Sequence, residues 1–341
     1  MMKSPLTGKE MLLKRESRVL TFRKEEFSVV YHYFLCEQSG ETFTSTELDQ
    51  INLQQLHNQY LQQHNLPFPE EIRQIRERYA LSATKMSEIL GFGVNSYRNY
   101  ELGEVPNLSN GKLIQLAADP RKFQNLIELS ESLTSDFKEK LRMKAESLTE
   151  AEVSNYFATE YIEYLFNGEF ADEFSGYRKP NMVKLAEMVV YFAAQLNPWK
   201  TQLNKLLFYA DFLMFKRSCF SISGARYRAI NMGPVPTNYN SLYEYIANQN
   251  DIDILVYDFG GEEFKPKPDR QFNPSVFSSQ ELEVLQQVVE RFAKIATKSA
   301  PTSELVETSH KERAWLDNAP QRKLISYKYA CLLYTSPSPR D

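Results

Sequence analysis

The sequence predicts a multi-domain protein that is mainly α-helical with small β elements, an α+β architecture. A length of 341 residues exceeds what one ordinary hydrophobic core accommodates, so two or three domains are expected. Hydrophobic residues at 42% and charged residues at 25% are typical of folded globular chains. Apolar residues recur at helical spacing along most of the chain, whereas strand-like runs are few and short.

Charge and cysteine content exclude several classes of protein. The balance of 40 Lys+Arg against 44 Asp+Glu excludes a globally basic nucleic-acid coat protein, but it allows one local DNA-binding module. Three widely spaced cysteines argue against a disulfide framework and fit a reducing cytosol. No apolar stretch follows the first residues, and the longest apolar run, 188–194, is too short to cross a membrane. We therefore expect a cytoplasmic protein without membrane contact.

Residues 1–65 are predicted to form a small β-then-α module. Val-, Tyr- and Phe-rich runs at 18–22 and 27–35 predict two strands joined by a charged turn. The stretch 44–47 offers a helix N-terminus, because apolar residues then recur at helical spacing up to Tyr60. Pro67 and Pro69 end this helix and open the next unit.

Residues 66–130 are predicted to contain a helix-turn-helix. A helix with Ile72, Ile75 and Tyr79 on one face is followed by a short helix that Ser82 can cap. A glycine-bearing turn then leads into a third short helix at 94–102. Two short helices, a turn and a third helix outline this motif, and further amphipathic segments follow at 113–118 and 123–129.

A charged helical linker at 131–176 is expected to lead into an α+β domain at 177–330. Gly168, Gly176 and Pro180 indicate the boundary. The segments expected beyond it are apolar helices at 182–196 and 203–215, strands at 222–232 and 252–259, and helices at 278–298 and 302–316. Residues 331–341 show no periodicity after Ala330, so they are interpreted as a non-native tail without function.

The third short helix is the candidate for reading DNA. Asn95, Arg98 and Asn99 fall at positions i, i+3 and i+4 and share one face, and these residue types bind adenine and guanine edges. Tyr97, Tyr100 and Leu102 are expected to pack inward. The predicted DNA-binding residues are Arg73, Lys85, Asn95, Ser96, Arg98 and Asn99.

A plain three-helix protein-binding module is the alternative for this segment. Acidic residues slightly outnumber basic ones between Pro69 and Glu104, so phosphate attraction depends on the placement of the few basic side chains. The motif geometry favours DNA binding.

The segment 90–103 resembles the recognition helix of MqsA/YgiT-type antitoxins. That helix commonly carries the pattern Asn-x-x-x-Arg-Tyr-Glu-x-Gly, and Asn95, Tyr100, Glu101 and Gly103 match it. Asn99 stands at the arginine position and Arg98 precedes it. The resemblance therefore implies a base contact for Asn95 alone.

The first residues resemble the zinc module of the same family in degenerate form. The family has Cys-Pro-x-Cys-Gly and Cys-x-x-Cys-Gly, where this chain has Ser-Pro-Leu-Thr-Gly at 4–8 and Cys-Glu-Gln-Ser-Gly at 36–40. A structural zinc site needs four Cys or His ligands, and only Cys36 remains. His32, His57 and His64 are scattered, so neither zinc nor any other cofactor is expected.

The C-terminal domain resembles the SocA-like Panacea domain found in antitoxins. The resemblance rests on the segments 203–211, 224–227, 232–236 and 309–315. It implies a domain that binds and neutralises a protein toxin.

From the residues alone, an aromatic and Met-containing patch near the rigid loop at 233–236 indicates a partner surface, although core packing explains aromatic residues equally well. The candidate partner-binding residues are Tyr209, Arg226, Tyr227, Met232, Pro234 and Tyr239.

No catalytic site is predicted. His310 with Glu312, and Asp211 with Arg226, are titratable pairs, but no nucleophile, base and orienting group occur together. The glycines at 260–261 indicate a hairpin turn rather than a phosphate loop.

We therefore expect a type II antitoxin that binds its toxin through the C-terminal domain and represses its own operon, as a homodimer on double-stranded operator DNA. The alternative is a regulator from a mobile element, or a protease adaptor, without a cognate toxin.

Overall fold

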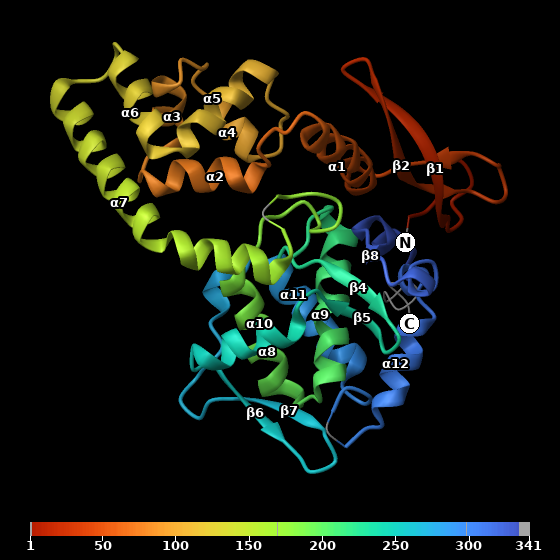
Figure 1. The fold of residues 1–341 in the computed structure, drawn as a ribbon. Helices are drawn as coiled ribbons and strands as arrows, with labels where there is room; N and C mark the ends of the chain where they lie inside the picture. Colours follow the sequence, from red (N-terminus) through yellow and green to blue (C-terminus); the bar gives the residue numbers. More distant parts are fainter. Residues whose placement is uncertain (1, 169, 298, 334–341) are drawn as a thin grey trace. The chain divides into compact units, whose positions relative to one another are not determined.

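Helices dominate the computed structural model, which describes residues 2–168, 170–297 and 299–333 (Figure 1). The strands form small antiparallel sheets, with the orders β1-β2-β3 and β5-β4-β8 and the hairpin β6-β7. This confirms the predicted fold class, mainly α with small β elements.

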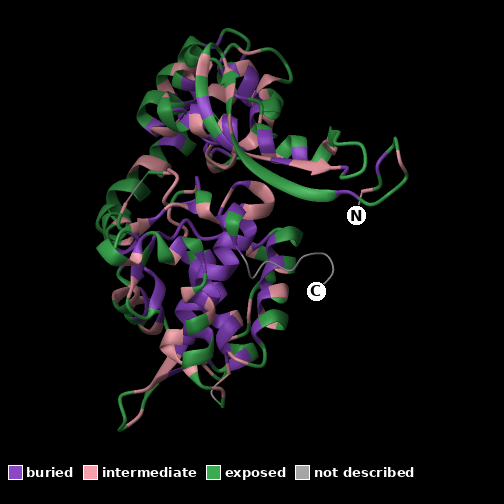
Figure 2. Cartoon of the chain, turned by 90° about the vertical axis from the view of Figure 1, so that its right-hand side faces the viewer, coloured by how far each residue is buried: buried purple, intermediate pink, exposed green. Residues whose placement is uncertain are grey.

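The chain divides into two compact units, which are described separately below. The first takes in the residues up to Glu16, the segment Val30–Ile51 and the chain from Tyr161 onward. The second takes in Ser17–Val29 and Asn52–Glu160. Each unit has its own set of buried residues (Figure 2).

The N-terminal elements follow the prediction in kind and are longer than expected. They are β1 (Leu12–Phe22), β2 (Glu25–Leu35), β3 (Thr42–Phe43) and α1 (Thr46–Gln63). Arg23 and Lys24 both have positive φ angles, 48° and 71°. Two consecutive left-handed residues between two strands match a tight hairpin turn whose twist suits the strands.

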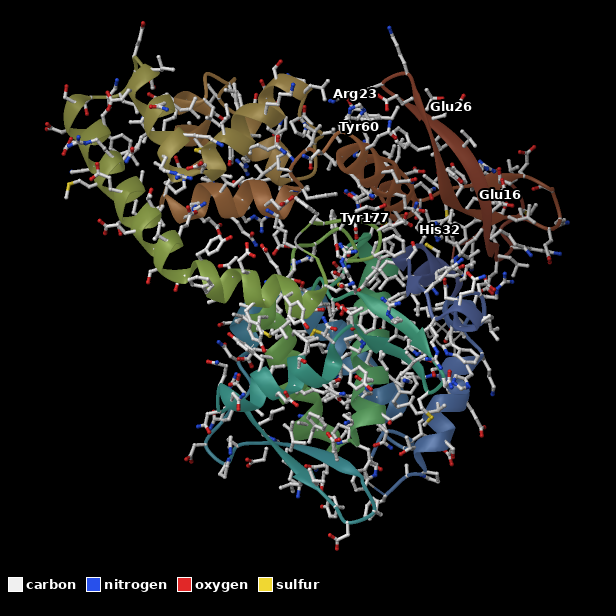
Figure 3. All side chains as sticks on the ribbon, in the orientation of Figure 1. Glu16, Arg23, Glu26, His32, Tyr60 and Tyr177 are labelled. Atoms are coloured by element: carbon white, nitrogen blue, oxygen red, sulfur yellow. The ribbon has the colours of Figure 1, made fainter. Side chains whose placement is uncertain are left out.

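The tip of this hairpin packs within the second unit (Figure 3). The ring of Phe22 meets that of Tyr60 edge to face at 5.1 Å. The Arg23 guanidinium donates hydrogen bonds to the carbonyl oxygens of Val105, at 2.7 Å, and Pro106, at 2.8 Å. These contacts join the hairpin tip to the following helices, so the compact units do not divide at residue 65.

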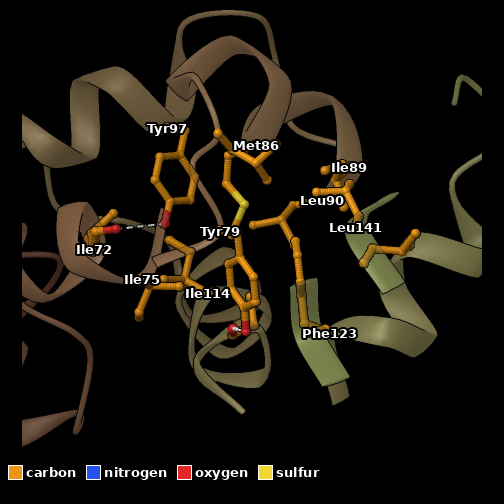
Figure 4. Close-up of a cluster of buried hydrophobic side chains, with 14 of the residues drawn as sticks. Ile72, Ile75, Tyr79, Met86, Ile89, Leu90, Tyr97, Ile114, Phe123 and Leu141 are labelled. Atoms are coloured by element: carbon orange, nitrogen blue, oxygen red, sulfur yellow. Dashed lines mark hydrogen bonds between the residues drawn. The ribbon is translucent and has the colours of Figure 1, made fainter. Parts of the chain in front are cut away.

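The second unit is built from short helices around one apolar core. They are α2 (Pro69–Arg78), α3 (Ala83–Ile89), α4 (Ser96–Glu101), α5 (Leu108–Ala118), α6 (Pro120–Leu129) and the first part of α7 (Ser135–Phe166). Figure 4 shows the core. The centre of this core is fully buried and is formed by Ile72, Met86, Tyr97, Ile114 and Phe123.

The middle of α7 is exposed along its whole length, with Glu152 paired to Arg78 of α2. Leu141 and Ala145 are buried in the core of the second unit, and Leu165 and Phe166 are buried in the first. Every residue from 151 to 160 is exposed. The predicted linker helix therefore exists, and its two ends belong to two different cores.

The first unit continues from Tyr161 onward as an α+β fold around α9. Its helices are α8 (Met182–Leu196), α9 (Lys200–Ser218), α10 (Tyr239–Asn248), α11 (Ser279–Phe292), α12 (Thr302–His310) and α13 (Arg313–Leu316). Its strands are β4 (Tyr227–Ile230), β5 (Gly233–Pro236), β6 (Ile252–Val256), β7 (Glu262–Pro266) and β8 (Leu324–Ile325). Short 3-10 turns are η1 (Pro274–Val276), η2 (Ala319–Gln321) and η3 (Tyr327–Leu332).

Several boundaries in this unit differ from the expectation. The helix expected at 278–298 ends at Phe292, and the strand expected at 252–259 ends at Val256. Of the predicted strand at 222–232, only β4 forms a strand. The amides of residues 222 and 223 bind the buried Asp211 carboxylate instead of a neighbouring strand. The helix expected at 302–316 is interrupted at Lys311 and Glu312, which separate α12 from α13.

The described fold extends past the expected boundary at Ala330. Cys331 and Leu333 are 2% and 6% exposed and pack in the first unit. Residues 334–341, the rest of the predicted tail, lie outside the described residues. Within the part of the chain that the structure describes, no helix is long and apolar enough to cross a membrane.

Candidate functional site

The α3–α4 pair in the second unit carries most of the residues assigned to DNA binding. The Ser82 side chain caps α3 by accepting a hydrogen bond from the Lys85 amide at 3.1 Å. At the other end Gly91 has φ +69°, and the Phe92 amide donates to the Ser87 carbonyl at 2.8 Å. A glycine in this conformation ends a helix and turns the chain, so α4 leaves in a defined direction.

Hydrogen bonds and one ion pair fix α4 to α2. The Tyr97 hydroxyl donates to the Ile72 carbonyl at 2.7 Å in the buried core (Figure 4). The Arg76 guanidinium binds both carboxylate oxygens of Glu101, at 2.5 and 3.1 Å. The hydrogen bond to Glu101 raises the pKa of Arg76. A two-point pair of this kind sets orientation as well as distance, so α4 has one position against α2.

The outer face of α4 is polar and accessible. Asn95, Arg98 and Asn99 are exposed, and Ser96 is half-buried. Asn95 precedes the first helical residue, so Arg98 and Asn99 lie on α4 itself. Arg73 is exposed on α2, whereas Lys85 pairs with Glu88 on α3.

Burial confirms two of the three residues expected to face inward from this helix. Tyr97 and Tyr100 are buried. The prediction for Leu102 was wrong, because its side chain is 73% exposed. Leu102 is the residue after α4, with φ −91° and ψ 1°, so its side chain does not follow the helical phase.

Ser4, Thr7, Cys36 and Ser39, the positions expected to correspond to zinc cysteines, lie together in the first unit. The Thr7 hydroxyl lies 3.4 Å from the Cys36 sulfur. Hydrogen bonds from Ser39, Ser4 and Thr7 lower the pKa of the Cys36 thiol to about 6. The two turns also share one backbone pattern, because the Gly8 and Gly40 amides each donate to the residue four positions earlier at 2.8 Å.

This donor set does not suit zinc. Neutral serine and threonine hydroxyls are not structural zinc ligands, and one thiolate does not make a site. No cluster of three or more His, Cys, Asp or Glu side chains suited to a metal ion occurs among the described residues.

Asp211 on α9 organises the loop that precedes β4. It is fully buried and accepts hydrogen bonds from the amides of Ile222 and Ser223 at 2.8 and 2.9 Å. It also accepts from the Ser223 hydroxyl at 2.6 Å and the Tyr227 hydroxyl at 2.7 Å. Arg226 instead binds Asp172 at 2.8 Å, so Asp211 and Arg226 bind different partners.

Four of the six residues assigned to partner binding are buried, and two are accessible to a partner. Tyr209, Tyr227, Arg226 and Pro234 are buried, and the Tyr227 hydroxyl is committed to Asp211. Met232 is 50% exposed and Tyr239 is half-buried. A protein partner of the folded domain can therefore reach Met232 and part of Tyr239.

The turn between β4 and β5 is held by residues from α9, α12 and α13. The Lys205 ammonium donates to the Pro234 carbonyl at 2.9 Å, and burial lowers the pKa of Lys205 to about 7. The Trp315 indole donates to the Ile230 carbonyl at 2.8 Å. His310 stacks on that indole with the ring centres 3.7 Å apart and hydrogen-bonds the Asn231 backbone.

Gly233 leaves no space for a side chain in this turn. Its φ is +93°, and a Cβ there would lie 2.4 Å from the Ser309 hydroxyl and 2.6 Å from the Lys205 side chain. The pKa of His310, which stacks on Trp315, is lowered by burial and then by the nearby Lys205.

The comparison with protein families concerns this same region, from α9 to α13. Residues 203–316 match the antitoxin SocA-like, Panacea domain. The Panacea match includes Asp211, the β4–β5 turn and the His310–Trp315 stack. Neither the curated proteins nor the solved structures include a match to the chain. The Panacea match suggests an antitoxin role with a protein toxin as partner.

Sequence reasoning missed the basic residues around the β4–β5 turn. Arg228 is exposed on β4, and Arg322 and Lys323 are exposed beside it. A single charged residue between the buried Tyr227 and Ala229 is the sequence signal for an outward-facing strand position. The pairing with β8, a long way along the chain, leaves no comparable signal.

Proposed function

We propose that the chain is an antitoxin that neutralises a cognate protein toxin through the region of the Panacea match and represses its own operon through α3 and α4. The Panacea match carries the first part of this proposal. The second part depends on the geometry of α4. The protein is expected to act in the cytoplasm.

The case for DNA binding rests on how α4 is presented. A Gly-terminated turn and the Arg76–Glu101 pair hold α4 in place, while Arg98 and Asn99 remain exposed. A helix presented in this way, with Arg and Asn outward, suits the major groove, where Arg reads guanine and Asn reads adenine. Two copies on a palindromic site are expected to provide the affinity that one six-residue helix cannot.

A growth assay tests the antitoxin activity. Each reading frame adjacent to the gene is expressed alone and together with the full-length chain. The proposal requires one neighbour that stops growth alone and is rescued by coexpression. If no neighbour is toxic, or none is rescued, the antitoxin function is excluded and a stand-alone regulator or adaptor becomes the better assignment.

An operator-binding assay tests the DNA-binding part separately. Arg98→Ala with Asn99→Ala is expected to weaken binding to the DNA upstream of the gene at least about tenfold, since each base contact contributes on the order of 1–3 kcal/mol. Lys112→Ala, an exposed basic residue on α5, is the matched control. Equal binding by the double variant and the control would remove α4 from the DNA interface.

Because one chain carries both surfaces, toxin binding and operator binding are expected to be coupled. Operator affinity is measured with and without saturating toxin. Identical affinities would show that the two activities are independent.

A further inference from the structure

Met232 stands at the end of a rigid turn. Its side chain is 50% exposed. The backbone around it is fixed, because the Trp315 indole binds the Ile230 carbonyl two residues earlier and Gly233, directly after it, is enclosed by Ser309 and Lys205. An exposed methionine on a fixed backbone loses little backbone entropy when a partner covers it. Methionine is also a side chain that adapts to varied apolar surfaces.

Basic side chains adjoin this turn. The Arg228 guanidinium donates to the Arg322 carbonyl at 2.9 Å, and the Ala229 amide donates to the Lys323 carbonyl at 3.1 Å, so these segments are adjacent. Arg228, Arg322 and Lys323 are exposed, and none forms an ion pair with another described residue. The chain as a whole carries a net charge of −4, so an unpaired basic cluster departs from its average.

Leu316 is the residue of α13 after Trp315, whose indole binds the Ile230 carbonyl, and its side chain is 47% exposed. We call the set of Arg228, Met232, Leu316, Arg322 and Lys323 the clamped-turn face. Arg322 and Lys323 lie beyond the residues of the Panacea match.

We propose that the clamped-turn face binds an acidic surface of the toxin, with Met232 as its apolar anchor. The inference rests on the proposed antitoxin function and names the surface that performs it. An apolar centre with a charged rim is the usual composition of a protein–protein interface. Nucleic acid is a poorer occupant, because a phosphate backbone gains nothing from the exposed Met232 and Leu316.

Charge complementarity favours this face over the strongly exposed apolar residues of the β6–β7 hairpin in the same unit. Val256 and Phe259 on the β6–β7 hairpin are 73% and 74% exposed. The lysines nearby are already paired, Lys200 with Glu262 and Lys265 with Glu263, so they do not offer the free positive charge of the clamped-turn face.

The experiment uses the full-length chain with a toxin that the wild type neutralises. Two variants test the face, Met232→Asp and the pair Arg228→Glu with Lys323→Glu. Two matched controls carry the same changes at exposed positions elsewhere in the unit, Phe259→Asp and the pair Arg291→Glu with Lys294→Glu. The dissociation constant for purified toxin, growth rescue and the thermal unfolding curve are measured for each.

Both face variants are expected to bind toxin at least about tenfold more weakly and to lose rescue, with controls within about twofold of the wild type. Wild-type affinity is also expected to fall severalfold between low and high salt, since the rim contacts are ionic. The salt measurement needs no variant, so it remains decisive if a variant fails to fold.

Full toxin affinity in both face variants would overturn the inference and leave the antitoxin function standing. The same holds if the variants lose only RNA binding, or only self-association, while toxin affinity stays. If the wild type itself rescues growth from no neighbour, the proposed function fails, and the inference fails with it.

Discussion

Lys205 is a buried lysine whose ammonium donates a hydrogen bond to the Pro234 carbonyl. Burial lowers its pKa to about 7, whereas an unfolded chain keeps this proton to about pH 10.4. Between these pH values the unfolded state binds more protons than the folded state. Stability therefore rises with pH across this interval, and the full cost of burying the charge remains below pH 7.

Replacing Lys205 with Met is expected to remove this dependence. Relative to the variant, the wild type should gain stability with increasing pH, approaching about 1.4 kcal/mol per pH unit between pH 7 and 10. Urea unfolding of both proteins at several pH values gives the difference, in which the other titrating groups cancel. A constant difference over this range would show that Lys205 keeps an ordinary pKa in the fold.

Asp211→Ala is expected to cost about 3 kcal/mol or more, because it leaves the buried amides of Ile222 and Ser223 and two hydroxyls without their acceptor. Denaturant unfolding measures the loss. Asp317→Ala, which breaks only the exposed pair with Arg313, is the control and should change stability by less than about 1 kcal/mol. Similar losses for both would remove Asp211 as the organising group of the loop.

At the scale of elements, the two N-terminal turns bring four small side chains together without the donor atoms that a metal needs. Sulfur atoms around a tetrahedral zinc, each about 2.3 Å from the metal, lie about 3.8 Å apart. The 3.4 Å between the Thr7 hydroxyl and the Cys36 sulfur is close to that separation. Hydrogen bonds from hydroxyls to Cys36 join the two turns.

Introducing three cysteines at these positions is therefore expected to create a zinc site. The triple variant Ser4→Cys, Thr7→Cys and Ser39→Cys should bind one zinc ion per chain with all-sulfur coordination, measurable by metal analysis and X-ray absorption. Addition of Cys36→Ser to this variant is the control and should weaken binding strongly. Unchanged zinc content in the triple variant would show that the four positions do not converge as described.

For the molecule as a whole, the two compact units predict two separate unfolding events. Ile72→Ala opens a cavity in the second unit and Asp211→Ala disrupts the first. Each is expected to lower one thermal transition of the full-length chain, by on the order of 10 °C, and to leave the other in place. Differential scanning calorimetry resolves the transitions, and a single transition lowered by both substitutions would contradict this independence.

Local patterns predicted most of the helices, because apolar periodicity and capping residues act over a few positions. The phase of α4 placed Tyr97 and Tyr100 inside, but it failed at Leu102, where the helix has ended. Long-range pairing was not predictable in the same way. Only the fold brings residues 222 and 223 to Asp211, and β8 to β4.

The candidate partner surface shows the same limit. Composition near the loop at 233–236 suggested aromatic contacts, but Tyr209 and Tyr227 are inside the core. Whether an aromatic residue faces a partner or the interior depends on packing that no local pattern records.

Met232 and Gly233 are neighbours under opposite constraints. Any side chain at 233 would collide with Ser309 and Lys205, so random mutagenesis should recover almost nothing but glycine there. The side chain at position 232 is half exposed, so substitutions there do not disturb the packing of the core. If this turn contacts the toxin, partner choice can drift by substitution at one position while its neighbour keeps the scaffold intact, which makes new specificities accessible in single mutational steps.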